Sequence, residues 1–303
     1  MKKIIISLML IVSVSSVYAQ QVPLFSSYNS NKMLLSPSTT GMDQLITTSL
    51  ISRLQFVGFE GAPITNLALA EFGKKDAPYG VGLALYSDRI GVLNNVGVQG
   101  NYGYRLKLSD DLKIGMGIAL AFDQWNFNAS QIKVEDLNDP ELFNRNQNTT
   151  TFRGDFGAHL DYKNLFISVA VPRVFATDIS FTNEITKKAV DIKQLRHVMA
   201  YVSYDIKLKG DKYVITPAAL VRLAQDFDPQ FDANVTVEYA KKIFGTVAYR
   251  QGYAASLGGG LQFSKRIRGG YAYDFPINAT QSYGAGSHEL MMKIRLGKIL
   301  DNE

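Results

Sequence analysis

Apolar and polar residues alternate along most of this chain, in segments of roughly ten residues that end at turns. Residues 230–240 show the pattern clearly, with one face formed by Phe231, Ala233, Val235, Val237 and Tyr239. Asp232, Asn234, Thr236 and Glu238 form the opposite face. Successive side chains of a strand point to opposite faces, so each such segment predicts a strand between an apolar and a polar environment.

The same reading along the chain predicts fourteen strands, although the first two and 164–172 alternate poorly. They are 45–53, 63–72, 79–87, 94–106, 111–123, 152–162, 164–172, 196–208, 212–223, 230–240, 243–251, 254–264, 267–276 and 286–297. Bacterial single-chain barrels have an even number of antiparallel strands, each about ten residues long. We therefore expect an all-β fold, a transmembrane antiparallel β-barrel of the bacterial outer membrane with about 14 strands. A soluble periplasmic sandwich is an alternative.

The lengths of the connections support the barrel. Every second connection is short, at 73–78, 107–110, 163, 209–211, 241–242 and 265–266, whereas the others include the long stretches 54–62, 124–151, 173–195 and 277–285. Alternate connections of a meander lie on the same side, and outer-membrane barrels have short periplasmic turns and long outer loops. This predicts that both termini face the periplasm.

The start of the chain predicts export. Met1-Lys2-Lys3, an apolar run and Val17-Tyr18-Ala19 have the form of a cleavable signal peptide over residues 1–19. Residues 20–44 are too polar for a strand, and their prolines disfavour a helix, so we expect an irregular periplasmic or plug segment ahead of a barrel over 45–303. The sequence leaves three interpretations of this segment open: a tether that binds a partner, a plug of the barrel lumen, or a disordered lead-in.

The composition mainly excludes kinds of site that the protein could otherwise contain. The chain of 303 residues has no cysteine, so neither a disulfide nor a thiolate metal site is available. The three histidines, His159, His197 and His288, lie on separate predicted strands without metal-ligand spacing. No catalytic constellation is visible, and we expect a protein that is not an enzyme and has no cofactor or metal. Its mean hydropathy of −0.03 does not discriminate, because a barrel averages lipid-facing and lumen-facing residues.

The net charge of +5 comes largely from the short turns and does not indicate nucleic-acid binding. Lys241, Lys242, Lys265 and Arg266 would form a cationic rim at the periplasmic end. Lysine in tight turns keeps strand ends solvated, which is one explanation. The other is a docking surface for an acidic periplasmic partner.

Several short blocks of residues follow one another along the chain in the order typical of one protein family. The first runs from Gln21 through Pro23, Phe25, Tyr28 and Asn31 to Gly41, and the second contains Arg53, Gln55, Phe56, Gly58 and Pro63. Later blocks contain Asp88 and Gly91, Tyr102 and Tyr104, Tyr271-x-Tyr273-Asp274, and Gly286-Ser287-His288-Glu289. Together they resemble the PorP/SprF family of outer-membrane proteins from the type IX secretion system of Bacteroidota. Phe56 stands where that family usually has tryptophan.

The resemblance implies a role in protein secretion and in gliding motility. Members of the family are thought to assist the secretion or surface attachment of large cargo proteins or adhesins that carry a type IX C-terminal signal. They are also associated with the periplasmic ring lipoproteins of that machine. The expected partners are therefore these proteins and outer-membrane lipids. A porin or transporter for small solutes is the alternative, since a barrel alone fits both.

The residues expected to contact partners come from these blocks, the cationic rim and one tryptophan. Trp125, the only tryptophan, lies in the predicted 124–151 loop and either completes the outer aromatic belt, which we favour, or belongs to a binding loop. The full set is Pro23, Phe25, Tyr28, Asn31, Arg53, Gln55, Trp125, Lys241, Lys242, Lys265 and Arg266.

Overall fold

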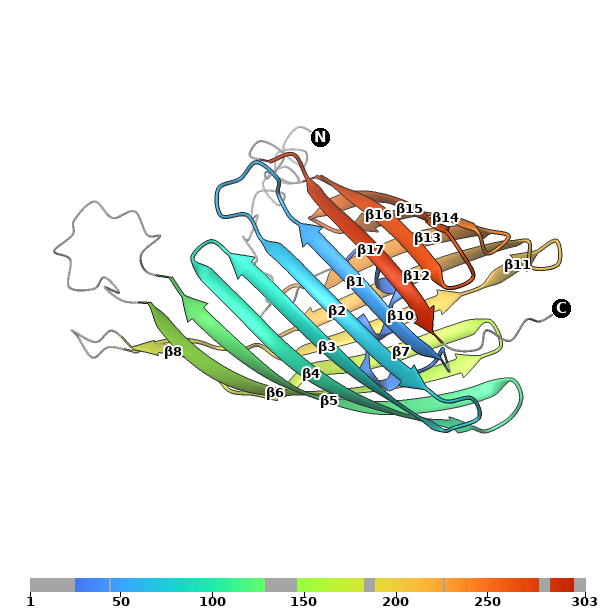
Figure 1. Ribbon diagram of the computed structural model, residues 1–303, viewed down its shortest axis with the longest axis horizontal. Coiled ribbons are helices and arrows are strands. Elements are labelled where there is room, and N and C mark those ends of the chain that lie inside the picture. Colours follow the sequence, from blue (N-terminus) through green and yellow to red (C-terminus); the bar gives the residue numbers. More distant parts are fainter. Residues whose placement is uncertain are drawn as a thin grey trace, which may run out of the picture.

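A computed structural model describes residues 25–43, 45–128, 146–182, 189–225, 227–277 and 284–296. The expected signal peptide and Pro23 lie outside these ranges. The described chain is a closed antiparallel β-barrel of fourteen strands, in which β1 pairs with both β2 and β17 (Figure 1). Both β10 and β11 pair with β12, so they form one interrupted strand.

The barrel strands are β1 Ile46–Leu54, β2 Ile64–Gly73, β3 Tyr79–Ile90, β4 Leu93–Lys107, β5 Leu112–Phe127, β6 Gln147–Tyr162, β7 Leu165–Ala176, β10 His197–Tyr204 with β11 Ile206–Leu208, β12 Tyr213–Ala224, β13 Gln230–Tyr239, β14 Ile243–Arg250, β15 Ala254–Gln262, β16 Ile267–Pro276 and β17 Ser287–Leu296. Each expected strand is present, including the three that alternate poorly. A small hairpin of β8 Ile179–Thr182 and β9 Ala189–Ile192 projects from the barrel.

The predicted 124–151 loop is too long. β5 continues to Phe127 and β6 starts at Gln147, because the register that pairs Asp123 with Thr151 extends to Phe127 and Gln147. Likewise, the predicted 173–195 loop contains the end of β7 and the β8–β9 hairpin. We call the end of the barrel with these connections the long-loop end and the opposite one the short-turn end (Figure 1).

The two faces of the wall differ as the alternation predicts. In β5, Met116, Ile118, Leu120 and Phe122 are at least half exposed, whereas Ala119 and Ala121 between them are buried in the lumen. Exposed tyrosines gather near the strand ends, among them Tyr79, Tyr104, Tyr162, Tyr204, Tyr239 and Tyr249. An outward apolar band with aromatic borders is what a membrane-spanning barrel needs.

The lumen is occupied by the chain's own N-terminal segment. Residues 25–43 form three short 3-10 turns, η1 Tyr28–Ser30, η2 Lys32–Leu34 and η3 Pro37–Thr39. Their side chains join two apolar clusters with lumen-facing residues of the wall, one around Tyr28 and Leu35 and the other around Met33. None of the helices in the described part of the chain is long and apolar enough to cross a membrane.

Candidate functional site

Residues 25–43, which we call the lumenal segment, run from one end of the barrel to the other. Ser26 contacts Arg53 at the end of β1 beside the long loops, whereas Gly41 contacts Glu71 near the end of β2 beside the short turns. The sequence leaves a partner-binding tether, a plug and a disordered lead-in open for residues 20–44. The described part crosses the lumen, where its polar groups find partners along the inner wall.

A buried ion cluster holds the start of the lumenal segment. Arg53 bridges two carboxylates, with Nη2 donating to Asp274 and Nη1 donating to Glu289 Oε2 at 3.0 Å. The three side chains are at most 2 % exposed. Glu289 also accepts from the backbone N–H groups of Ser26 and Ser27 at 2.7 and 2.8 Å, and Ser26 Oγ donates to Asp274 at 2.8 Å. These charge-assisted bonds fasten the segment to β1, β16 and β17.

Tyr28 and Asn31 continue the attachment towards the middle of the lumen. The Tyr28 hydroxyl donates to Asp232 Oδ1 at 2.7 Å. Asn31 is 1 % exposed, and its Oδ1 accepts from Ser49 Oγ at 2.7 Å. Buried polar groups require such partners, so both side chains specify one position of the segment.

Near the short-turn end the backbone of the segment lies directly on the wall. A Cβ added at Gly117 would overlap the backbone of Pro37 and Ser38, and one added at Gly80 would overlap that of Thr40. A Cβ at Gly103 would lie 3.0 Å from the Thr40 carbonyl oxygen. These lumen-facing glycines therefore permit the backbone of the segment to approach the wall closely.

Charged groups fix the last residues of the segment. Lys293 Nζ lies 2.9 Å from Asp43 Oδ2, and Gly41 N donates to Glu71 at 2.9 Å. Although burial acts to raise it, the Lys293 ammonium holds the pKa of the Asp43 carboxyl below its usual range. The segment is therefore held by hydrogen bonds to buried carboxylates at the long-loop end and by an ion pair and a hydrogen bond to a carboxylate at the short-turn end.

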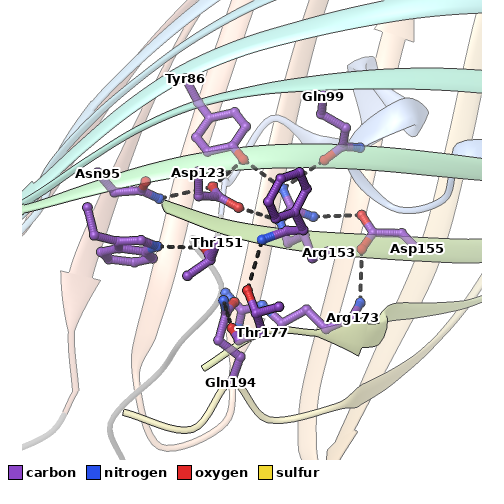
Figure 2. A network of polar contacts seen from close by, with 12 residues as sticks. Tyr86, Asn95, Gln99, Asp123, Thr151, Arg153, Asp155, Arg173, Thr177 and Gln194 are labelled. Carbon is purple, nitrogen blue, oxygen red and sulfur yellow. Dashed lines mark hydrogen bonds and ion pairs between the residues drawn. The ribbon is translucent and has the colours of Figure 1, made fainter. Parts of the chain in front are cut away.

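A second polar network lies on the inner wall near the long-loop end (Figure 2). Arg153 on β6 donates to Asp155 at 2.7 Å, to Gln99 at 2.8 Å and to the Tyr86 hydroxyl at 3.0 Å, and Nε lies 3.3 Å from Asp123. Tyr86 also donates to Asp123. The alternation pattern does not single out this network, although its members share the lumen-facing parity of neighbouring strands.

The wall is irregular beside that network. The pairing of β6 with β7 shifts between Gly154 and Phe156, and Arg173 has a φ of 58°. The Arg173 backbone N–H donates to Asp155 Oδ1 at 2.9 Å, which replaces a ladder bond at this bulge (Figure 2).

The structure brings Phe25, Tyr28, Asn31 and Arg53 together in the lumen. Gln55 lies beyond them at the long-loop end, where Nε2 donates to the Tyr253 hydroxyl at 3.0 Å. Our preference for Trp125 in the lipid-facing belt was wrong. It lies in β5 on the lumen-facing parity, and its Nε1 donates to Thr151 Oγ1 at 3.2 Å, because the strand continues past Asp123.

The cationic rim forms a separate surface at the short-turn end. Lys241, Lys242, Lys265 and Arg266 are exposed in the turns that follow β13 and β15. Gln262 N donates to the Lys242 carbonyl oxygen at 2.7 Å, which places the start of the second turn beside the first. The rim lies at the opposite end from the Arg53 cluster, so the residues predicted to contact partners do not lie together in one place.

Within the described ranges, no group of three or more histidine, cysteine or carboxylate side chains is arranged to hold a metal ion. The chemistry of the lumen is instead that of permanent contacts between ion pairs, amides and hydroxyls. Such contacts position a segment of chain.

Comparison with solved structures supports the barrel fold and nothing further. The monoaromatic hydrocarbon channel CymD is 12 % identical, with a TM-score of 0.54 over 91 % of this chain and 94 % of that one. The outer-membrane protein Omp33 of Acinetobacter baumannii is 13 % identical, with a TM-score of 0.48 over 84 % of this chain and 99 % of that one. No curated protein matches the sequence.

The sequence profile of one family covers most of the chain. The profile of the type IX secretion system membrane protein PorP/SprF matches residues 17–294, which include the lumenal segment and every barrel strand up to β17. The barrel fold and the family profile both indicate that the protein resides in the bacterial outer membrane. The chain is a bacterial outer-membrane protein and belongs to the PorP/SprF family of the type IX secretion system.

Proposed function

We propose that this barrel is a non-enzymatic component of the type IX secretion system that assists the secretion or surface attachment of large cargo proteins through protein–protein contacts. One observation carries the proposal: the lumen is crossed by the chain's own residues 25–43, which hydrogen bonds to a buried ion cluster fasten at the long-loop end. A lumen filled in this way favours contacts made by the surfaces and ends of the barrel over passage through it.

The cationic rim is the surface that we assign to a periplasmic partner. Lys241, Lys242, Lys265 and Arg266 are exposed side by side, and complementary charge accelerates and orients association with an acidic surface. The periplasmic ring lipoproteins of the secretion machine are the expected partners.

Affinity isolation of the tagged protein from outer membranes tests this assignment. Replacement of all four rim residues by glutamate should reduce the recovery of periplasmic partners, and the loss should be smaller at high salt, where the native contact is itself screened. Arg89→Glu with Arg196→Glu is the matched control, since both arginines are exposed towards the long-loop end. Equal recovery from the rim variant and the native protein would rule out docking through the rim.

Conductance in planar bilayers tests the small-solute alternative. The native protein should give little ohmic current, because residues 25–43 occupy the lumen, and deletion of residues 25–43 should increase it. Stable large channels in the native protein, with unaltered cargo display in a deletion strain, would favour a porin instead.

A further inference from the structure

A cavity of about 180 Å³ lies in the lumen between the lumenal segment and the inner wall of the barrel. It is lined from one side by residues of the segment, including Phe25, Met33 and Leu34. Strands β2 to β7 and β10 form the other side. The volume equals that of about six molecules of liquid water, so the cavity is large enough for a small organic molecule.

The cavity has an apolar part and a polar part. Leu67, Leu69, Ala84, Ala170 and Met199 supply an apolar wall from the deeper lumen. Towards the long-loop end the lining is polar and aromatic, with Asp88, Asn95, Asp123, Arg153, Asp155 and Trp125. A mostly apolar pocket with a few convergent polar groups is the usual form of a small-molecule site.

The charged side chains of the polar part are held in place before any ligand arrives. Arg153 bonds to Asp155 and Gln99, lies within ion-pair distance of Asp123, and is only 14 % exposed (Figure 2). These groups are therefore oriented by one another, which reduces the ordering that a ligand would have to impose.

One acceptor in the lining is left without a donor. Asn95 is 8 % exposed, and its Nδ2 donates to Asp123 at 3.3 Å, but its Oδ1 has no hydrogen-bond partner among the described residues. The neighbouring Asp88 accepts from Thr65 Oγ1 at 2.6 Å and also lines the cavity. Leaving a buried acceptor unpaired is costly, so a ligand that supplies an N–H donor is favoured here.

The charge of the lining favours a cation. Three carboxylates, those of Asp88, Asp123 and Asp155, face two guanidinium groups, those of Arg153 and Arg173, which leaves one negative charge in excess. Trp125 and Tyr86 add aromatic rings to the same part of the lining, and aromatic faces attract ammonium groups.

From this geometry we propose that the cavity binds a small amine with an apolar body. The ammonium group donates to Asn95 and Asp88, and the apolar body lies against Leu67, Leu69 and Met33. The site is independent of the proposed role in secretion, since it uses neither the cationic rim nor a partner protein.

Trp125 provides a direct readout, because it is the only tryptophan in the chain and lines the cavity. Purified full-length protein in detergent is titrated with 2-phenylethylamine while its tryptophan emission is recorded. The expected result is a saturable change, absent with phenylacetate, which presents a carboxylate on the same ring. No saturable change, or an equal change with both probes, overturns the proposal.

Variants test the two acceptors. Asn95→Leu and Asp88→Asn should each weaken binding of 2-phenylethylamine by about tenfold or more, since the first removes an acceptor for the ammonium group and the second removes the negative charge that faces it. Asn101→Leu is the matched control on the same strand and lumenal face, outside the cavity lining, and should bind as the native protein does. Heat-modifiable gel mobility confirms that each variant is folded. Unchanged affinity in the folded Asn95 and Asp88 variants would show that the probe binds elsewhere.

Discussion

The Arg53 cluster allows a quantitative test of how the lumenal segment is held. Arg53→Met removes the guanidinium but keeps an apolar side chain of similar length, and it leaves Asp274 and Glu289 as buried carboxylates without a cation. At 3.0 Å and an effective dielectric constant of about 20, one such pair is worth about 5.5 kcal/mol of Coulomb energy. Desolvation of the charges offsets much of that energy in the native protein.

Two further arguments bound the effect of the substitution. Removal of one partner of a buried ion pair costs about 3–5 kcal/mol, because it leaves an uncompensated charge. The protein can escape by protonating a carboxyl group, which at pH 7 costs about 4 kcal/mol for a group that normally titrates near pH 4. We therefore expect the free energy of unfolding to fall by about 3–5 kcal/mol at pH 7.

The assay is urea unfolding in detergent micelles, with the folded fraction measured from gel mobility without heating. Arg266→Met is the matched control, since this arginine is exposed at the rim, and it should change the free energy of unfolding by less than about 0.5 kcal/mol. The triple variant Arg53→Met, Asp274→Asn and Glu289→Gln should recover at least half of the loss, because the cluster then holds no unpaired buried charge. A loss below 1 kcal/mol for Arg53→Met, or one equal to that of Arg266→Met, would refute the reasoning.

Two other predictions concern the short-turn end of the lumenal segment. Gly117→Val should expel residues 36–40 from the wall, because a side chain there overlaps the backbone of Pro37 and Ser38. Gly100→Val is the control and should leave the segment in place, since nothing lies within 4 Å of a Cβ at that position. The rate of protease cleavage of the segment in folded protein measures both effects, and equal rates in the two variants would contradict the close contact. Because the pKa of Asp43 is depressed in the folded protein, its contact with Lys293 contributes stability at neutral pH that is lost as the pH falls below about 4. Hydrogen exchange of the amides of residues 40–43, corrected for intrinsic rates, should show this loss of protection, and the same pH dependence in Lys293→Met would count against the ion pair.

The sequence by itself determined the barrel. A period of two places every lipid-facing side chain on one parity, so Phe231, Val235 and Tyr239 indicate the outer face without any knowledge of their neighbours. Turn lengths then separate the two ends. The alternation even places Tyr79 and Tyr249 on the outer surface, because strand direction and parity are local properties.

The tertiary structure decided what fills the lumen. Segment 25–43 has no periodic pattern, and its conformation follows from partners far away in the chain: Ser27 bonds to Glu289, Tyr28 to Asp232, and Pro37 lies against Gly117. Trp125 was misplaced for the same reason, since only its pairing with Thr149 shows that β5 continues past Asp123. Contacts between residues more than two hundred positions apart depend on closure of the barrel, which no local pattern in the sequence encodes.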